Sequence, residues 1–237
     1  MSEAPPARTY RYIDLVTAAF VTVLVCASLI GPAKITEFDL PVVGSITFSA
    51  AVIFFPLSYV FGDILTEVYG FRRARRVIWT GFAALLFASA MTVMMLALPS
   101  ASFWDQQPAY ETVFGNTWRI VVASITAYWC GEFVNSYVLA KMKVWQGGRR
   151  LWARTIGSTV FGEGVDSLVF FPLAFYNSGI LPNEAILAVA LTEFVLKVGI
   201  ETLMTPVTYR VVALLKRTEQ EDVYDRDTDF SPFRLGG

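Results

Sequence analysis

Six long apolar stretches constrain this chain more than any other feature of its sequence. They cover residues 12–32, 44–67, 77–98, 118–140, 155–177 and 184–214, and a helix of about 20 mostly apolar residues is long enough to cross a bilayer. Hydrophobic residues make up 55% of the 237 residues, and the mean hydropathy is +0.52, which is more apolar than a soluble domain needs for one core. The sequence therefore predicts an all-α integral membrane protein with six transmembrane helices.

Lysine and arginine predict the orientation, because short cytoplasmic loops carry an excess of these residues. The N-terminus, the second connection and the fourth connection hold most of them: Arg8, Arg11, Arg72, Arg73, Arg75, Arg76, Lys141, Lys143, Arg149, Arg150 and Arg154. The opposite side holds Lys34 and Arg119. Both termini are therefore expected in the cytoplasm (N-in/C-in). We expect a cytoplasmic segment at 1–10, a six-helix transmembrane domain at 11–217 and an acidic, disordered cytoplasmic tail at 218–237.

The tetrapeptide FFPL occurs twice, at 54–57 and at 170–173. With three spans in each half, the two copies would occupy equivalent places in a 3+3 inverted repeat, with Pro56 and Pro172 breaking matching helices near mid-membrane. Such a repeat would place a ligand site between the halves. The alternative is coincidence, since these residue types are common in transmembrane helices.

The first and third apolar stretches are nearly free of charge, whereas eight charged residues in the apolar zone of the other four need an explanation. Seven are acids and one is a lysine: Asp63, Glu67, Glu132, Glu163, Asp166, Glu193, Glu201 and Lys197. A charged side chain at the centre of a bilayer costs about 2.5 to 3.5 kcal/mol even on insertion scales. The acids therefore need either partners or a function.

Pairing within one helix explains some of these charges. Glu193, Lys197 and Glu201 follow i, i+4 spacing on one helix face, which favours an internal ion pair. Asp63 and Glu67 are also one turn apart, but no lysine lies on their stripe. Arginines of the following loop are within reach of Glu67, whereas Asp63 lies deeper and has no evident partner.

Glu163 and Asp166 share a helix face with Ser158 and neighbouring threonines. Two acids among small polar residues favour a polar cavity, although single Ser and Thr residues also join helices. A carboxylate accepts two parallel hydrogen bonds, so a ring N–H beside an exocyclic amine would suit it. Aromatic residues such as Tyr59, Trp129 and Phe170 would stack on a flat ring, but they also simply fill membrane spans.

Other classes of function have less support. The chain has no His and no phosphate-binding Gly-rich loop, and we find no nucleophile or metal constellation, so no catalytic residues, metal or cofactor are predicted and an enzyme is not expected. A net charge of −1 gives no general attraction to nucleic acid. The expected partners are the lipid bilayer and a planar, nucleobase-like small molecule, and the small size allows a homodimer.

Two stretches resemble the YhhQ-type queuosine precursor transporter family, formerly classed as vitamin uptake transporters. They are FFPLSYVFGDILTEVYGFRRARRVIWTGF at 54–82 and RTIGSTVFGEGVDSLVFFPLAFYNSG at 154–179. The resemblance implies a six-helix carrier for 7-deazaguanine bases, in the cyano or aminomethyl form. It also implies that the family's motif positions here are Asp63, Glu67, Arg154, Ser158, Asp166 and Ser167.

The sequence therefore predicts a multi-pass transporter of the bacterial inner membrane that imports a queuosine precursor for tRNA modification. The alternative is a substrate-binding subunit of an ATP-driven vitamin or nucleobase uptake system. The candidate substrate-binding residues are those of the motifs and their expected neighbours: Tyr59, Asp63, Glu67, Trp129, Glu132, Asn135, Arg154, Ser158, Glu163, Asp166, Ser167 and Phe170.

Overall fold

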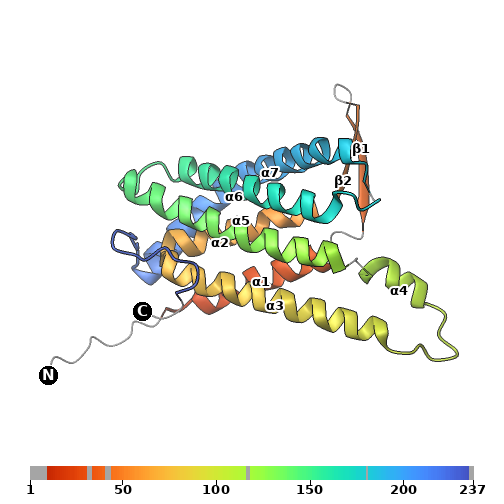
Figure 1. Cartoon of the computed structure of the whole chain (residues 1–237). Coiled ribbons are helices and arrows are strands. Elements are labelled where there is room, and N and C mark those ends of the chain that lie inside the picture. The colour runs from red at the N-terminus through yellow and green to blue at the C-terminus, as the bar shows by residue number, and fades with distance from the viewer. Residues whose placement is uncertain (1–9, 31–33, 41–43, 116–117, 180, 235–237) are drawn as a thin grey trace.

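The computed structural model describes residues 10–30, 34–40, 44–115, 118–179 and 181–234. These residues form a helical bundle with one small hairpin (Figure 1). The elements are α1 (Ile13–Leu29), β1 (Ile35–Leu40), β2 (Gly44–Ser49), α2 (Ala51–Tyr69), α3 (Phe71–Ala97), α4 (Gln107–Phe114), α5 (Trp118–Trp145), α6 (Leu151–Phe175) and α7 (Asn183–Glu219).

The predicted helical character is confirmed, and six of the helices correspond to the six apolar stretches. By length and hydropathy, α2 and α3 qualify as membrane spans within the described residues. The apolar α1 has 17 residues, slightly short of the usual span. The short α4 is an additional helix between α3 and α5 that the sequence did not predict.

The hairpin corrects the all-α prediction. Residues 44–49, expected at the start of the second span, instead form β2, which pairs antiparallel with β1 in the register Ile35↔Ser49 to Leu40↔Gly44. The two strands contain β-branched and aromatic residues in partial alternation with polar ones, a pattern that suits a pleated ribbon better than a helix. Phe38 and Phe48 stack across the pair, with ring centroids 5.7 Å apart.

Helix α2 lies at the centre of the bundle. It packs against α1, α3, α5 and α7, while α6 packs between α5 and α7. Most of α2 is buried, including polar side chains as well as apolar ones such as Ile64 and Val68. Every polar residue on α2 therefore faces another helix, which places its carboxylates in the interior.

A single residue, Gly70, separates α2 from α3. Its backbone has φ +83° and ψ 163°, a conformation that costs glycine little because it has no Cβ. The chain can therefore reverse at once, and the arginine-rich start of α3 lies beside the end of α2. Figure 1 shows this end of the bundle, with the end of α7, opposite the hairpin and α4.

Pro56 lies inside α2 and Pro172 inside α6. Pro56 is close to the start of its helix and Pro172 is close to the end of its helix, so the two prolines do not mark matching breaks near mid-helix. The inverted repeat stays a prediction.

Candidate functional site

Asp63 lies where α2, α5 and α6 meet. Its side chain is buried, and its Oδ1 accepts a hydrogen bond of 2.9 Å from Nδ2 of Asn135. The hydroxyl of Ser158 lies 3.5 Å from the same oxygen, which is too long for more than a weak hydrogen bond. Three predicted site residues from three helices therefore converge on one point.

Glu132 extends from α5 against the backbone of α2. Its side chain is fully buried, and neither carboxylate oxygen has a hydrogen-bond partner among the described residues. The carboxylate fits because the facing residue is Gly62, where a methyl group would collide with Oε1 of Glu132. The hydroxyl of Tyr59 is likewise buried without a partner in the described part of the chain. Unpartnered buried polar atoms are uncommon and call for a functional explanation.

Lys197 of α7 neutralises acids of a different helix. Its Nζ lies 3.1 Å from Oε2 of Glu163 and 3.1 Å from Oδ2 of Asp166, both on α6. The closest ion pairs of Lys197 are therefore between helices, while Glu193 of its own helix still interacts with it electrostatically. A lysine inside a bundle gains more from two buried carboxylates on a neighbour than from the 0.2 to 0.5 kcal/mol or so of an i, i+4 pair.

Glu201 completes the polar interior from α7. Its Oε1 accepts a short hydrogen bond from the hydroxyl of Thr159 on α6, while Oε2 has no partner among the described residues. Across the described residues, no three acids or cysteines are arranged to hold a metal ion. We name the residues that line this region the interior acidic cluster: Tyr59, Asp63, Glu132, Asn135, Ser158, Thr159, Glu163, Asp166, Lys197 and Glu201.

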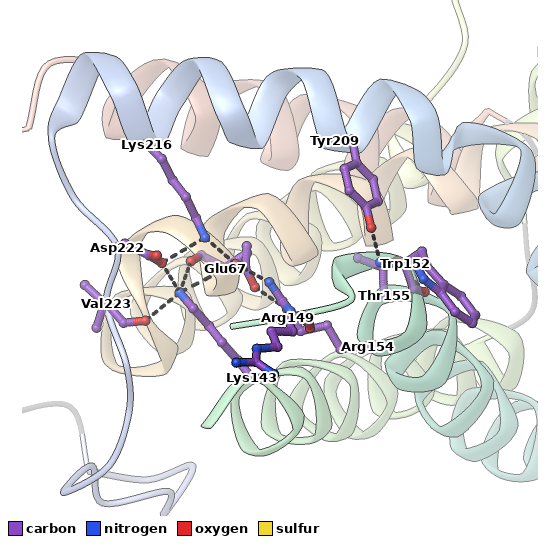
Figure 2. A network of polar contacts seen from close by, with 10 residues as sticks. All are labelled: Glu67, Lys143, Arg149, Trp152, Arg154, Thr155, Tyr209, Lys216, Asp222 and Val223. Carbon is purple, nitrogen blue, oxygen red and sulfur yellow. Dashed lines mark hydrogen bonds and ion pairs between the residues drawn. The ribbon is translucent and has the colours of Figure 1, made fainter. Parts of the chain in front are cut away.

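A second network surrounds Glu67, one turn after Asp63 (Figure 2). Arg154 of α6 binds both oxygens of Glu67, with Nε to Oε2 and Nη2 to Oε1 at 2.7 Å each. Lys216 of α7 lies 2.5 Å from Oε1, and Lys143 of α5 lies 3.6 Å from it. One carboxylate of α2 thus binds cations from three other helices.

Asp222 belongs to the same network from the tail that follows α7. Lys143 and Lys216 approach its Oδ1 to 2.5 Å and 2.8 Å. Burial by itself raises the pKa of Asp222, but hydrogen bonds from these two lysines outweigh it and hold the pKa below its usual value. Lys143 also donates to the backbone carbonyls of Glu67 and Val223, so it joins α5, α2 and the tail (Figure 2).

The rest of the described tail, up to residue 234, lies along α3 and α5. Arg75 donates to the carbonyls of Asp229 and Ser231, and Nε1 of Trp79 donates to the carbonyl of Pro232. The ring of Phe230 packs on Phe71 at 4.9 Å. The acidic composition of the tail predicted disorder, whereas these residues make specific contacts with the bundle.

The remaining predicted site residues lie outside these two networks. Trp129 packs in an aromatic group with Trp79, Phe133 and Phe233, the last of which belongs to the tail. Its indole N–H has no hydrogen-bond partner among the described residues, so it does not join the interior acidic cluster by a hydrogen bond. Phe170 packs against two other phenylalanines of α6. The buried hydroxyl of Ser167 has no partner within the described ranges.

Sequence reasoning missed Lys143, Lys216 and Asp222 as parts of the Glu67 network. All three lie in charged segments at helix ends or in the tail, where solvated side chains are the usual outcome. Only the fold brings them to Glu67. The phenylalanines in the sequence DFSPFR at 229–234 were the available signal that the tail packs against the helices.

The fold and these two networks define a helical bundle with a buried, acid-rich interior. The sequence matches a family described as "Putative vitamin uptake transporter" over residues 49–211. That region covers more than half of the chain, and the chain therefore belongs to this family of transporters. The resemblance to YhhQ-type proteins seen in the two motifs is confirmed by this match.

Relatives with assigned names are described as transporters of a queuosine precursor. The chain is 28% identical over 159 residues to the "Probable queuosine precursor transporter" of Bacillus subtilis, covering 67% of this chain and 69% of the relative. It is 29% identical over 166 residues to the "Queuosine precursor transporter" of Escherichia coli, covering 69% and 72%. A Haemophilus influenzae relative is 29% identical over 128 residues, covering 52% of this chain and 50% of that protein. No solved structure matches.

Proposed function

We propose that the protein imports a 7-deazaguanine precursor of queuosine, in the cyano or aminomethyl form, across the bacterial inner membrane. The observation that carries the proposal is the interior acidic cluster, where buried hydrogen-bond acceptors outnumber donors. The names of the relatives support the same substrate class. An enzyme is not proposed, because the relatives with assigned names are called transporters.

The charges of the cluster favour a ligand that is rich in N–H groups. Lys197 is shared between Glu163 and Asp166, while Asp63 receives its main hydrogen bond from a neutral amide, that of Asn135. Among the described residues, free acceptor atoms remain on Glu132 and Glu201. A guanine-type edge presents two parallel donors, which a carboxylate binds in a bidentate manner.

The arrangement of the helices supports alternating access. Asp63, Glu132 and Glu163 are each at most 1% exposed, so the structure is closed around the cluster. The Glu67 network joins α2, α5, α6 and α7 at the end of the bundle that holds the tail. We place this end in the cytoplasm, with six spanning helices, both termini inside and the hairpin outside, because the loops at this end are rich in lysine and arginine.

Substitution of the cluster carboxylates tests the proposal. Asp63→Asn, Glu163→Gln and Asp166→Asn should each lower uptake of a labelled precursor at least tenfold, because loss of one charge-assisted hydrogen bond costs about 1.5 to 3 kcal/mol. Glu111→Gln, on the exposed face of α4, is the matched control. Uptake is measured in cells that lack other precursor carriers, with membrane levels checked by immunoblot. Full uptake by all three variants would overturn the proposal.

Reconstitution separates a self-sufficient carrier from an ATP-driven binding subunit. Liposomes that contain only this chain should accumulate or exchange the precursor without any ATPase. A thermal-shift series with deazaguanines, guanine and common vitamins then ranks ligands, because a ligand that binds only the folded state raises its stability. Stabilisation by a vitamin and not by a deazaguanine would contradict the proposed substrate.

A further inference from the structure

We propose that Glu132 is a proton-binding site of the transport cycle. Its carboxyl group holds a proton in the closed, unliganded form and releases this proton to water when the donor-rich edge of the substrate binds. This inference rests on the proposed function, because the substrate's N–H groups are what replace the proton.

The surroundings of Glu132 provide neither water nor a cation. The side chain is 0% exposed. Among the described residues, neither oxygen has a hydrogen-bond partner, and no lysine or arginine forms an ion pair with it. The other interior carboxylates differ in this respect, since Asp63 receives a hydrogen bond from Asn135 and Glu163 is paired with Lys197.

The shape of the site holds the carboxyl group in place. Oε1 of Glu132 occupies the space that a side chain at Gly62 would fill. Glu132 therefore presses directly on the backbone of α2, one residue before Asp63. The packing also excludes water from this point of the α2 and α5 contact.

Other ionisable groups around Glu132 are mostly acidic. They come from every helix that faces it: Tyr59 and Asp63 from α2, Tyr128 from α5, Glu163 and Asp166 from α6, and Glu201 from α7. Within the described residues, Lys197 is the one cation that contacts these acids, and it is paired with Glu163 and Asp166 of α6.

An ionised Glu132 would be very costly in these surroundings. A buried carboxylate without a partner loses its hydration, and in practice such a group takes up a proton instead. Repulsion from neighbouring carboxylates acts in the same direction. The closed structure therefore requires a neutral Glu132.

Binding of the proposed substrate reverses this preference. A protonated carboxyl group has one oxygen occupied by hydrogen, so it cannot accept two parallel hydrogen bonds as a carboxylate does. Two N–H donors on one edge of the base stabilise the ionised form. One proton then leaves for each substrate bound, and linkage requires that affinity rises with pH.

The test measures affinity and proton release together. Purified protein in detergent is titrated with 7-cyano-7-deazaguanine, which carries no ammonium group, between about pH 5 and pH 8. For the unaltered chain we expect the Kd to fall by up to about tenfold for each unit by which the pH is raised, over the range where Glu132 is protonated. In weak buffer, binding should release close to one proton per site. Glu111→Gln should behave identically.

Glu132→Gln should bind with a Kd that does not depend on pH and should release no proton. An infrared difference spectrum gives a second readout, because binding to the unaltered chain should remove a carbonyl band of a protonated carboxyl group. If Glu132→Gln does not fold, the same band and the proton count in Glu163→Gln decide, since both should persist there.

The outcomes separate this inference from the proposed function. Binding with a pH-independent Kd and no proton release would overturn the role of Glu132 and leave the substrate assignment standing. Proton release that persists in Glu132→Gln, or that disappears in Glu163→Gln when the substrate saturates the site, would also overturn it. Absence of binding by the unaltered chain at every pH would instead contradict the proposed function.

Discussion

Glu67 is the residue on which the largest number of buried charges depends. It binds Arg154 through both oxygens and also contacts Lys143 and Lys216. Three cations share one acid, with Asp222 of the tail as the second anion. Loss of one cation leaves Glu67 with the other two, whereas loss of Glu67 leaves all three cations without this carboxylate. Glu67 should therefore contribute more to stability than any one of the cations.

This asymmetry predicts the effects of two substitutions. Glu67→Gln leaves the buried Arg154 and Lys143 without their shared carboxylate and should destabilise the protein by about 3 to 5 kcal/mol, the usual cost of breaking a buried pair from one side. Arg154→Gln leaves Glu67 with two lysines and should cost less. Thermal unfolding in detergent compares the two variants. An equal or larger loss for Arg154→Gln would contradict this explanation of the network.

At the scale of helices, two glycines set the approach of α5 to α6. A Cβ at Gly162 would lie 2.7 Å from Cβ of Asn135 and 3.0 Å from the carbonyl oxygen of Gly131. A Cβ at Gly131 would lie 2.9 Å from Cβ of Asp166. The contact therefore needs small residues, as helix interfaces in membranes often do, and it places Asn135 and Asp166 in the interior acidic cluster.

Gly162→Ala should force α5 and α6 apart. We expect a loss of about 1 to 3 kcal/mol from overpacking and a strong loss of uptake, because Asn135 would move away from Asp63. Gly164→Ala is the matched control on the same helix, since a Cβ there would meet nothing nearer than 3.9 Å. It should be neutral or slightly stabilising, as alanine favours a helix by up to about 1 kcal/mol over glycine. Equal effects of the two alanines on Tm and uptake would refute the role of this contact.

At the scale of the whole molecule, the chain closes one end of its bundle with its own tail. The described residues after α7 contact α2, α3 and α5 through Val223, Asp229 and Asp222, among others. These contacts join the helices at this end of the bundle to one another. The tail therefore stabilises the closed end of the bundle.

Phe230→Ala should weaken this contact. The ring packs on Phe71 and Tyr137 and lies 4.1 Å below the ammonium of Lys141, so its loss should cost about 1 to 2 kcal/mol, less than for a fully buried phenylalanine. Limited proteolysis of the tail should then be roughly 5 to 30 times faster. Asp227→Ala, at an exposed position of the same tail, should be cleaved at the unaltered rate. Unchanged cleavage of Phe230→Ala would show that the tail is held by other contacts.

Much of the architecture was predictable because hydrophobicity and helical spacing are local properties of the sequence. The apolar stretches predicted the main helices, and the acids within them predicted a polar interior. The two motifs predicted the family. The β hairpin was missed because a short apolar run with β-branched residues is ambiguous between helix and strand.

Local composition specifies which residues are apolar enough to be buried and which charged residues are buried with them. The tertiary fold selects the partner of each charge: the acids that pair with Lys197 lie on α6, Glu67 gathers cations from three helices, and Glu132 packs against Gly62 among other acids. The physical reason is that burial depends on composition within one segment, whereas pairing depends on distances between segments that are far apart in the chain.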